Sequence, residues 1–137
     1  MIMPDQELLI KYRIEQAKAV LKDAKTLLAY EGSLSSIINR SYYAMFYATL
    51  SLLAVLNKGT SKHSGVISLF DKYFVKESII SKERSKSLHR AFGLRQMADY
   101  NELMSVDVED AQILIHEAEF FIKDVEKVLQ EKYLVKL

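Results

Sequence analysis

The chain has 137 residues, of which 50% are hydrophobic and 27% charged, and its formal net charge is +1. The composition is ordinary for one globular domain and argues against a disordered or fibrous chain. The small net charge argues against a protein that coats nucleic acid. The sequence contains no cysteine, which excludes disulfides, thiolate metal sites and cysteine nucleophiles. We therefore expect one domain over residues 1–137.

The N-terminal residues MIMPDQELLIKY lack the basic start and the apolar run of a signal peptide. The longest apolar stretch, residues 42–56, is about 15 residues long, whereas a membrane-spanning helix needs about 20. We expect a cytoplasmic protein with no membrane partner.

The first half of the sequence predicts two long helices. One runs over residues 5–30, where apolar residues recur at helical spacing; they are Ile10, Ile14, Ala17, Leu21, Ala24 and Leu28. The second follows residues 31–33 and runs to about residue 57. Its apolar residues cover nearly the whole circumference, which predicts a central helix surrounded by others. Gly32 and Gly59 follow the two helices, as C-cap glycines do.

The second half predicts three more helices. Residues 58–64 form a polar loop, and residues 66–75 form a short helix that points Val66, Leu69, Phe70 and Phe74 inward. A fourth helix covers residues 81–100. The last begins near Asp107, which can cap it, and its 3.6-residue stripe consists of Ala111, Leu114, Ile115, Ala118, Phe121, Ile122, Val125 and Leu129. The fold class is all-α: an up-and-down bundle of four long helices plus one short helix.

Charge is unevenly distributed along the second half. Basic residues outnumber acidic ones over residues 72–95, whereas residues 99–119 contain acidic residues and no Lys or Arg. Solvated helix faces explain both runs. The alternative is a basic surface for a polyanion beside an acidic surface for a partner.

Arg40 lies in the run RSYYAMFYA, residues 40–48, within the predicted central helix. Arg40 and Tyr47 are seven residues apart and share a helix face, with Tyr43 between them. A buried guanidinium is costly unless it is paired. Arg40 therefore forms an internal ion pair that fixes the helix register, or it contacts a nucleotide or another anion together with the tyrosines.

A second group of polar residues, Arg95, Asp99 and Tyr100, lies near the end of the fourth predicted helix. Arg95 and Asp99 are four residues apart and can pair along the helix, which contributes only a few tenths of a kcal/mol at the surface. The alternative is chemical. An arginine that stabilises phosphoryl charge, beside a hydroxyl or imidazole, supplies the minimum parts for metal-free RNA cleavage by the 2′-hydroxyl.

The three histidines are scattered. His63 lies in a basic loop of small residues that opens a helix and can hold a phosphate, although a hydrogen bond that fixes the loop is the commoner explanation. His116 is expected at the surface. The sequence has no His-x-x-x-His pair and no Gly-rich phosphate loop, so we expect neither a metal nor a cofactor.

Three segments in order resemble the HEPN domain family, specifically its short stand-alone prokaryotic members. They are RSYYAMFYA at 40–48, KHSGVISLF at 62–70 and LRQMADY at 94–100, and a final helix with AEFFIKDVEKVL follows them. The resemblance covers almost the whole chain. It implies a helical bundle that forms a homodimer with the functional cleft at the dimer interface, and for many members a ribonuclease toxin paired with a minimal nucleotidyltransferase.

The resemblance also implies site residues. Arg95 matches the arginine of the family signature and Gln96 the polar residue after it, while Tyr100 stands where a histidine would be, and Tyr47 also replaces a histidine. Tyrosine, with a pKa of about 10, transfers protons poorly near pH 7 compared with imidazole. This favours a dimeric module that binds RNA or a nucleotide over an endoribonuclease that uses Arg95, Asp99 and Tyr100. Tyr100 is also the candidate acceptor of nucleotides from the partner.

Overall fold

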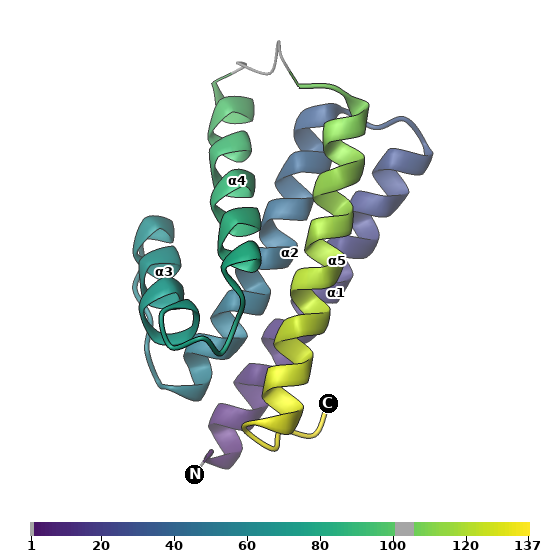
Figure 1. Cartoon of the computed structure of the whole chain (residues 1–137). Coiled ribbons are helices and arrows are strands. Elements are labelled where there is room, and N and C mark those ends of the chain that lie inside the picture. Colours follow the sequence, from purple (N-terminus) through teal and green to yellow (C-terminus); the bar gives the residue numbers. More distant parts are fainter. Residues whose placement is uncertain (1, 101–105) are drawn as a thin grey trace.

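The computed structural model describes residues 2–100 and 106–137. Within these ranges the elements are α1 (Pro4–Ala29), α2 (Leu34–Val55), α3 (His63–Phe70), the π-helical segment η1 (Asp71–Val75), α4 (Lys82–Asp99) and α5 (Val108–Glu131). Figure 1 shows the four long helices alongside one another, each running opposite to the one before it, with α3 at the side of the bundle. The predicted all-α bundle is confirmed.

Polar side chains fix the helix ends. Ser33 accepts a hydrogen bond at 3.2 Å from the backbone N–H of Ser36 and caps α2. Asp107 accepts one at 3.0 Å from the backbone N–H of Asp110 and caps α5, as predicted. At the other end of α2, the amide of Gln6 donates to the carbonyls of Ala54 and Val55 at 2.8 and 2.6 Å, which ties the start of α1 to the end of α2.

The central helix of the bundle is α2, which packs against α1, α3, α4 and α5. Its side chains Tyr42, Met45, Leu52 and Leu53 are fully buried. Every member of the predicted stripe on α5 is buried as well. Burial of a large apolar side chain contributes roughly 1.5–3 kcal/mol, so this core dominates the stability of the fold.

The short helix differs from the prediction in both its start and its form. It begins at His63, so His63 belongs to the first turn of α3 and not to a loop. Its second half is the π-helical segment η1, in which Lys76 N donates to Asp71 O at 2.8 Å. This turn keeps both Phe70 and Phe74 buried, and the ring centroid of Phe70 lies 5.5 Å from that of Phe121 on α5.

The predicted glycine caps are wrong. The residues with left-handed backbone after α1 and α2 are Glu31 and Asn57, with φ of 55° and 52°, and no described glycine has positive φ. The chain therefore turns one or two residues before Gly32 and Gly59. Among residues 2–100 and 106–137, no helix is long and apolar enough to cross a bilayer.

Candidate functional site

A cleft of about 410 Å³ opens where α2 begins and α4 ends. The described residues that line it are Leu27 of α1, Ser35, Ser36, Asn39 and Arg40 of α2, and Arg95, Ala98 and Asp99 of α4. The first turns of α2 and the last turns of α4 lie at the same end of the bundle because the two helices run in opposite directions (Figure 1). Antiparallel packing therefore brings two arginines, 55 positions apart in the chain, to one cleft.

Arg40 is half-buried and is held by neighbours on its own helix. Its Nε and Nη2 donate to Asn39 Oδ1 at 3.0 and 2.6 Å. Its guanidinium lies 5.5 Å from the ring centroid of Tyr43, which in turn lies 5.5 Å from that of Tyr47. Within the described residues no carboxylate pairs with Arg40, so the structure does not show the internal ion pair that would have explained its burial.

Arg95 approaches the same aromatic ring from α4. Its guanidinium lies 5.3 Å from the ring centroid of Tyr43 and 5.4 Å from that of Tyr42. Asp99, one turn later on α4, is 3.7 Å from Arg95 Nε, and that buried Nε makes no hydrogen bond to any described residue. Tyr43 thus bridges two guanidiniums, a cation–π arrangement in which Arg can still donate to an anion.

Behind Arg95 lies an imidazole from a third element. His63, the first residue of α3, stacks on Phe46 with the ring centroids 4.2 Å apart. Its Nδ1 is 2.8 Å from the hydroxyl of Tyr42 and 3.3 Å from Nη1 of Arg95. A guanidinium can only donate, so Nδ1 must accept and the ring proton must sit on Nε2. His63 therefore helps to orient the Arg95 guanidinium.

The local environment favours the neutral forms of His63 and Tyr42. Burial lowers the pKa of His63, and the nearby charge of Arg95 lowers it further. Burial also raises the pKa of Tyr42 far above its ordinary value, against the opposing charge of Arg95. At neutral pH a protonated Tyr42 donates to an uncharged His63, and the positive charge of this corner resides on Arg95.

The predicted site residues fall into three groups. Arg40, Arg95 and Asp99 line the cleft, and Tyr43, Tyr47 and His63 support it from behind. Gln96 is exposed, and Tyr100, at the end of α4, has an exposed fraction of 76%. Neither is among the described residues that line the cleft.

Tyr42 was not predicted as a site residue from the sequence. Its side chain is fully buried, yet its hydroxyl makes the shortest polar contact to His63. A phenol on the inward face of an apolar helix needs a hydrogen-bond partner, and that requirement is the signal that would have identified it. Among residues 2–100 and 106–137, no three His, Asp or Glu side chains gather in a group suited to a metal ion.

The fold and the cleft define a helical domain with a cleft that contains two arginines, with tyrosines packed beside their guanidiniums. The family model described as "HEPN domain" matches residues 10–128. The chain therefore belongs to the HEPN family, as the sequence motifs predicted.

Three relatives illustrate this membership. The chain is 39% identical over 129 residues to the "UPF0332 protein" of Thermotoga maritima, and the match covers 94% of this chain and 97% of the relative. It is similar to two proteins of Methanocaldococcus jannaschii. "Putative toxin MJ0142" is 32% identical, with 93% and 90% of the two chains covered. "Putative toxin MJ0605" is 36% identical, with 89% and 90% covered.

Proposed function

We propose that this HEPN protein is a dimeric module that binds the phosphate groups of RNA or of a nucleotide in the cleft between Arg40 and Arg95. The observation that carries the proposal is the pair of guanidiniums around Tyr43. In the described structure no carboxylate pairs with Arg40, and the carboxylate of Asp99 approaches Arg95 only at its Nε, at 3.7 Å. Guanidiniums bind phosphate through two parallel hydrogen bonds, which are about twice as strong as bonds between neutral groups.

The other residues of the cleft suit the same ligand. The hydroxyls of Ser35 and Ser36 and the amide of Asn39 line it, and each can bond to phosphate or ribose oxygens. The volume of about 410 Å³ lies within the range of small-ligand sites, roughly 300–1,000 Å³. A nucleotide, or one nucleotide of an RNA strand, is a ligand of suitable size.

We further propose that the protein is a homodimer and acts with a minimal nucleotidyltransferase as a toxin–antitoxin pair. The names of the two Methanocaldococcus relatives support the toxin role. The exposed ring of Tyr100, at the end of the helix that carries Arg95, is accessible to a partner enzyme that transfers nucleotides. Light scattering should give the mass of a dimer at micromolar concentration, and a monomer there would contradict the proposed state.

Equilibrium binding tests the ligand. Fluorescence anisotropy with a labelled single-stranded RNA should show that Arg95→Gln weakens binding by roughly 10- to 100-fold, since a charge-assisted hydrogen bond contributes about 1.5–3 kcal/mol. Arg90→Gln is the matched control because it removes one positive charge from the same helix, where Arg90 instead pairs with Glu117 of α5. Equal losses in the two variants would contradict a specific role for the cleft.

A metal-independent endoribonuclease is the second candidate, and the contact between His63 and Arg95 favours it. Transfer of the 2′-hydroxyl proton to the carboxylate of Asp99, which lines the cleft beside Arg95, would let that oxygen attack its own phosphate. The bond from phosphorus to O5′ would break, the 5′-oxygen would take a proton, and a 2′,3′-cyclic phosphate would remain. Arg95 would stabilise the phosphorane. His63, whose Nδ1 lies 3.3 Å from Arg95 Nη1, would hold the guanidinium in place for this role.

Incubation with a mixed RNA pool separates the two candidates. Cleavage by the wild type that both Arg95→Gln and His63→Ala abolish would support the nuclease. Intact RNA in the presence of wild-type protein that binds it would leave the binding module as the function. The termini of any product should be a cyclic phosphate and a 5′-hydroxyl.

A further inference from the structure

A second cluster of cations and an aromatic ring lies outside the cleft. Lys58, in the loop after α2, places its Nζ 4.7 Å from the ring centroid of Tyr73, and Lys72 places its Nζ 5.2 Å from the same centroid. We name these three residues the distal cluster. Two segments that are far apart in the sequence therefore converge on one phenol.

The π-helical turn fixes the position of this ring. Phe74 is buried, while its neighbour Tyr73 remains partly exposed. Asp71, the first residue of η1, accepts a hydrogen bond from Ser85 Oγ at 2.6 Å, and its other oxygen lies 2.7 Å from His89 Nε2. These contacts fasten η1 to α4, so the ring of Tyr73 is presented by an anchored segment.

The cations of the distal cluster are not neutralised. Lys18 and Lys25 of α1 lie 2.9 and 3.1 Å from carboxylates of α5, whereas Lys58 and Lys72 have no such partner in the described part of the chain. A hydrogen bond and charge from Lys58, followed by the charge of Lys72, lower the pKa of Tyr73. Two ammonium groups at one ring repel each other, so an anion between them would be favourable.

The helical segment of α3 and η1 connects Tyr73 of the distal cluster to His63, which lies behind Arg95. His63, which contacts Arg95, begins α3, and Tyr73 follows ten positions later in η1. At 1.5 Å per residue, His63 and Tyr73 are separated by about 15 Å along the helix axis. A few nucleotides of single strand can span such a distance, whereas one nucleotide cannot. Lys62 and Lys76, exposed at the two ends of this segment, add positive charge along it.

We propose that Lys58, Lys72 and Tyr73 form a second contact for single-stranded RNA, in which the lysines bind a backbone phosphate and the tyrosine stacks on a base. This inference rests on the proposed function, because it takes the Arg40–Arg95 cleft as the first contact. The ligand is then a strand of several nucleotides and not a mononucleotide. Pairing of basic residues with an exposed aromatic ring is the usual chemistry of single-strand binding.

The test compares RNA length across matched variants. Binding of 5′-labelled oligouridylates of 2, 4, 8 and 12 nucleotides, and of AMP by competition, is measured for the wild type and for Lys58→Gln/Lys72→Gln. The control is Lys22→Gln/Lys123→Gln, which removes two exposed lysines from α1 and α5. Tyr73→Phe and Tyr73→Leu separate stacking from the hydroxyl, and circular dichroism checks that each variant folds.

The wild type should bind the 8-mer at least tenfold more tightly than the dinucleotide. The Lys58→Gln/Lys72→Gln variant should bind the 8-mer about tenfold more weakly than the wild type and the dinucleotide equally well, since neutralised phosphates and stacked bases each contribute on this scale. Tyr73→Leu should lower the affinity for the 8-mer several-fold, and Tyr73→Phe should leave it unchanged.

Three results would overturn the inference in distinguishable ways. If the Lys58→Gln/Lys72→Gln variant and its control bind the 8-mer equally, and Arg95→Gln still weakens binding, the cleft stands and the second contact does not. If the wild type binds AMP as tightly as the 8-mer, the ligand is a nucleotide. If it binds neither, the proposed function fails together with the inference.

Discussion

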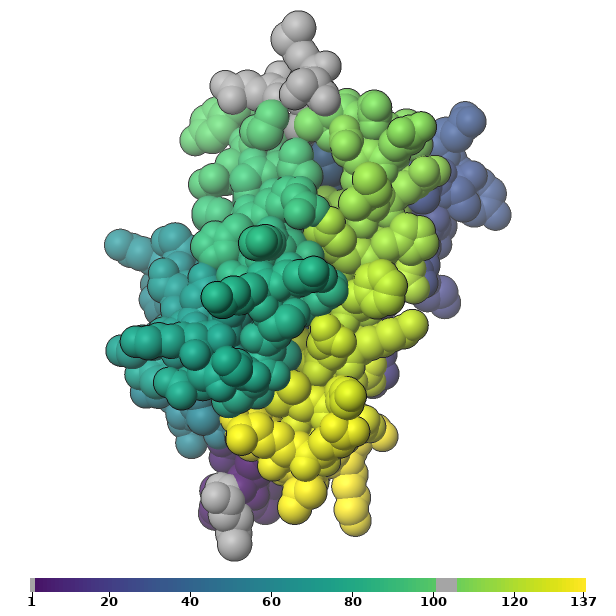
Figure 2. Space-filling model, in the orientation of Figure 1, coloured from purple at the N-terminus to yellow at the C-terminus, as the bar shows by residue number. Residues whose placement is uncertain are grey.

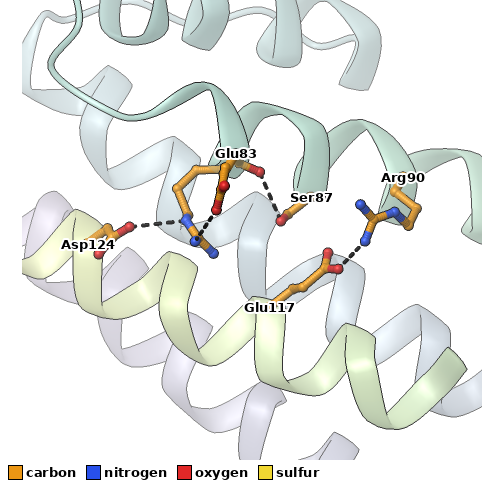
Figure 3. A network of polar contacts seen from close by, with 6 residues as sticks. Glu83, Ser87, Arg90, Glu117 and Asp124 are labelled. Atoms are coloured by element: carbon orange, nitrogen blue, oxygen red, sulfur yellow. Dashed lines mark hydrogen bonds and ion pairs between the residues drawn. The ribbon is translucent and has the colours of Figure 1, made fainter. Parts of the chain in front are cut away.

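The α4 helix carries two kinds of arginine. Arg84 and Arg90 face α5, where Arg84 Nε lies 3.1 Å from Asp124 Oδ2 and Arg90 pairs with Glu117; Figure 3 shows these contacts with the carboxylates of α5 below α4. In Figure 2 side chains of α4 lie against side chains of α5. Arg95, one to three turns further on, faces α2, which contains no Asp or Glu.

The side chains of the facing helix therefore determine whether an arginine of α4 forms an ion pair. The basic run of residues 72–95 and the acidic run of residues 99–119 face each other in part, so that their charges pair and stabilise the packing of α4 on α5. Arg95 and Arg40 meet tyrosines and an amide, and no carboxylate of a neighbouring helix pairs with them in the described structure; Arg95 has only Asp99 of its own helix, 3.7 Å from its Nε. The same residue type pairs with a neighbouring helix at one end of α4, and at the other end lies in the cleft that we propose binds phosphate.

The largest expected effect is on the salt dependence of RNA binding. Arg40→Gln/Arg95→Gln should weaken binding by at least about 100-fold. It should also reduce the slope of log K against log salt by about 1.4, or about 0.7 for each phosphate contact on a single strand. The matched variant Arg84→Gln/Arg90→Gln should leave the slope unchanged. Equal slopes in the two double variants would remove the distinction between the two kinds of arginine.

Stability should show the reverse order. The side chain of Arg84 is 15% exposed and its guanidinium lies 5.6 Å from the ring centroid of Phe120. Arg84→Gln should therefore lower the free energy of unfolding by about 1–2 kcal/mol, between the values of exposed and buried pairs. Arg95→Gln should lower it by less, about 0.5–1 kcal/mol, because it loses the cation–π contacts with Tyr42 and Tyr43 but leaves no carboxylate of another helix unpaired. Urea unfolding measures both, and a larger loss for Arg95→Gln would contradict this account.

A smaller effect is expected at His63, which acts through Arg95. His63→Ala should weaken RNA binding by roughly three- to tenfold, the scale of one hydrogen bond of about 1 kcal/mol. His63→Asn should rescue most of this loss because its carbonyl oxygen can accept from Arg95 at the position of Nδ1. Identical affinities for the two variants would show that the accepting atom does not matter.

The smallest effect concerns pH. Because the pKa of His63 is lowered in the folded protein, the unfolded chain takes up the proton first as the pH falls below about 6.5. The stabilising effect of the neutral imidazole is therefore full above that pH and is lost as the pH drops toward the folded pKa. Between pH 7 and pH 5 the wild type should lose more Tm than His63→Asn. Parallel losses would place the titration on other groups.

Much of the fold could be predicted from the sequence. The apolar residues of α5 recur every 3.6 residues, and this helix is buried on one side. Those of α2 cover nearly its whole circumference, and this helix is central. Both patterns can be read from local spacing in the sequence. The π-helical segment could not be predicted, because its geometry arises from packing of Phe74 and from contacts of Asp71 with α4.

The site was predicted less completely. The motifs identified Arg40 and Arg95, but not the contact between Arg95 and His63, which joins residues 32 positions apart. No periodicity encodes a contact between a helix start and a distant helix face. Tyr42 and Tyr43 are adjacent in the sequence, and only the structure shows that Tyr42 bonds to the imidazole while Tyr43 lies against both guanidiniums.

NMR of the arginine side chains tests most directly whether RNA binds at Arg40 and Arg95. In a ¹H–¹⁵N spectrum, the Nε–Hε signals of Arg40, Arg95, Arg84 and Arg90 can be followed as a single-stranded RNA 8-mer is added. Our account predicts saturable shifts for Arg40 and Arg95, and unchanged signals for Arg84 and Arg90. Shifts confined to Arg84 and Arg90, or equal shifts in all four signals, would contradict it.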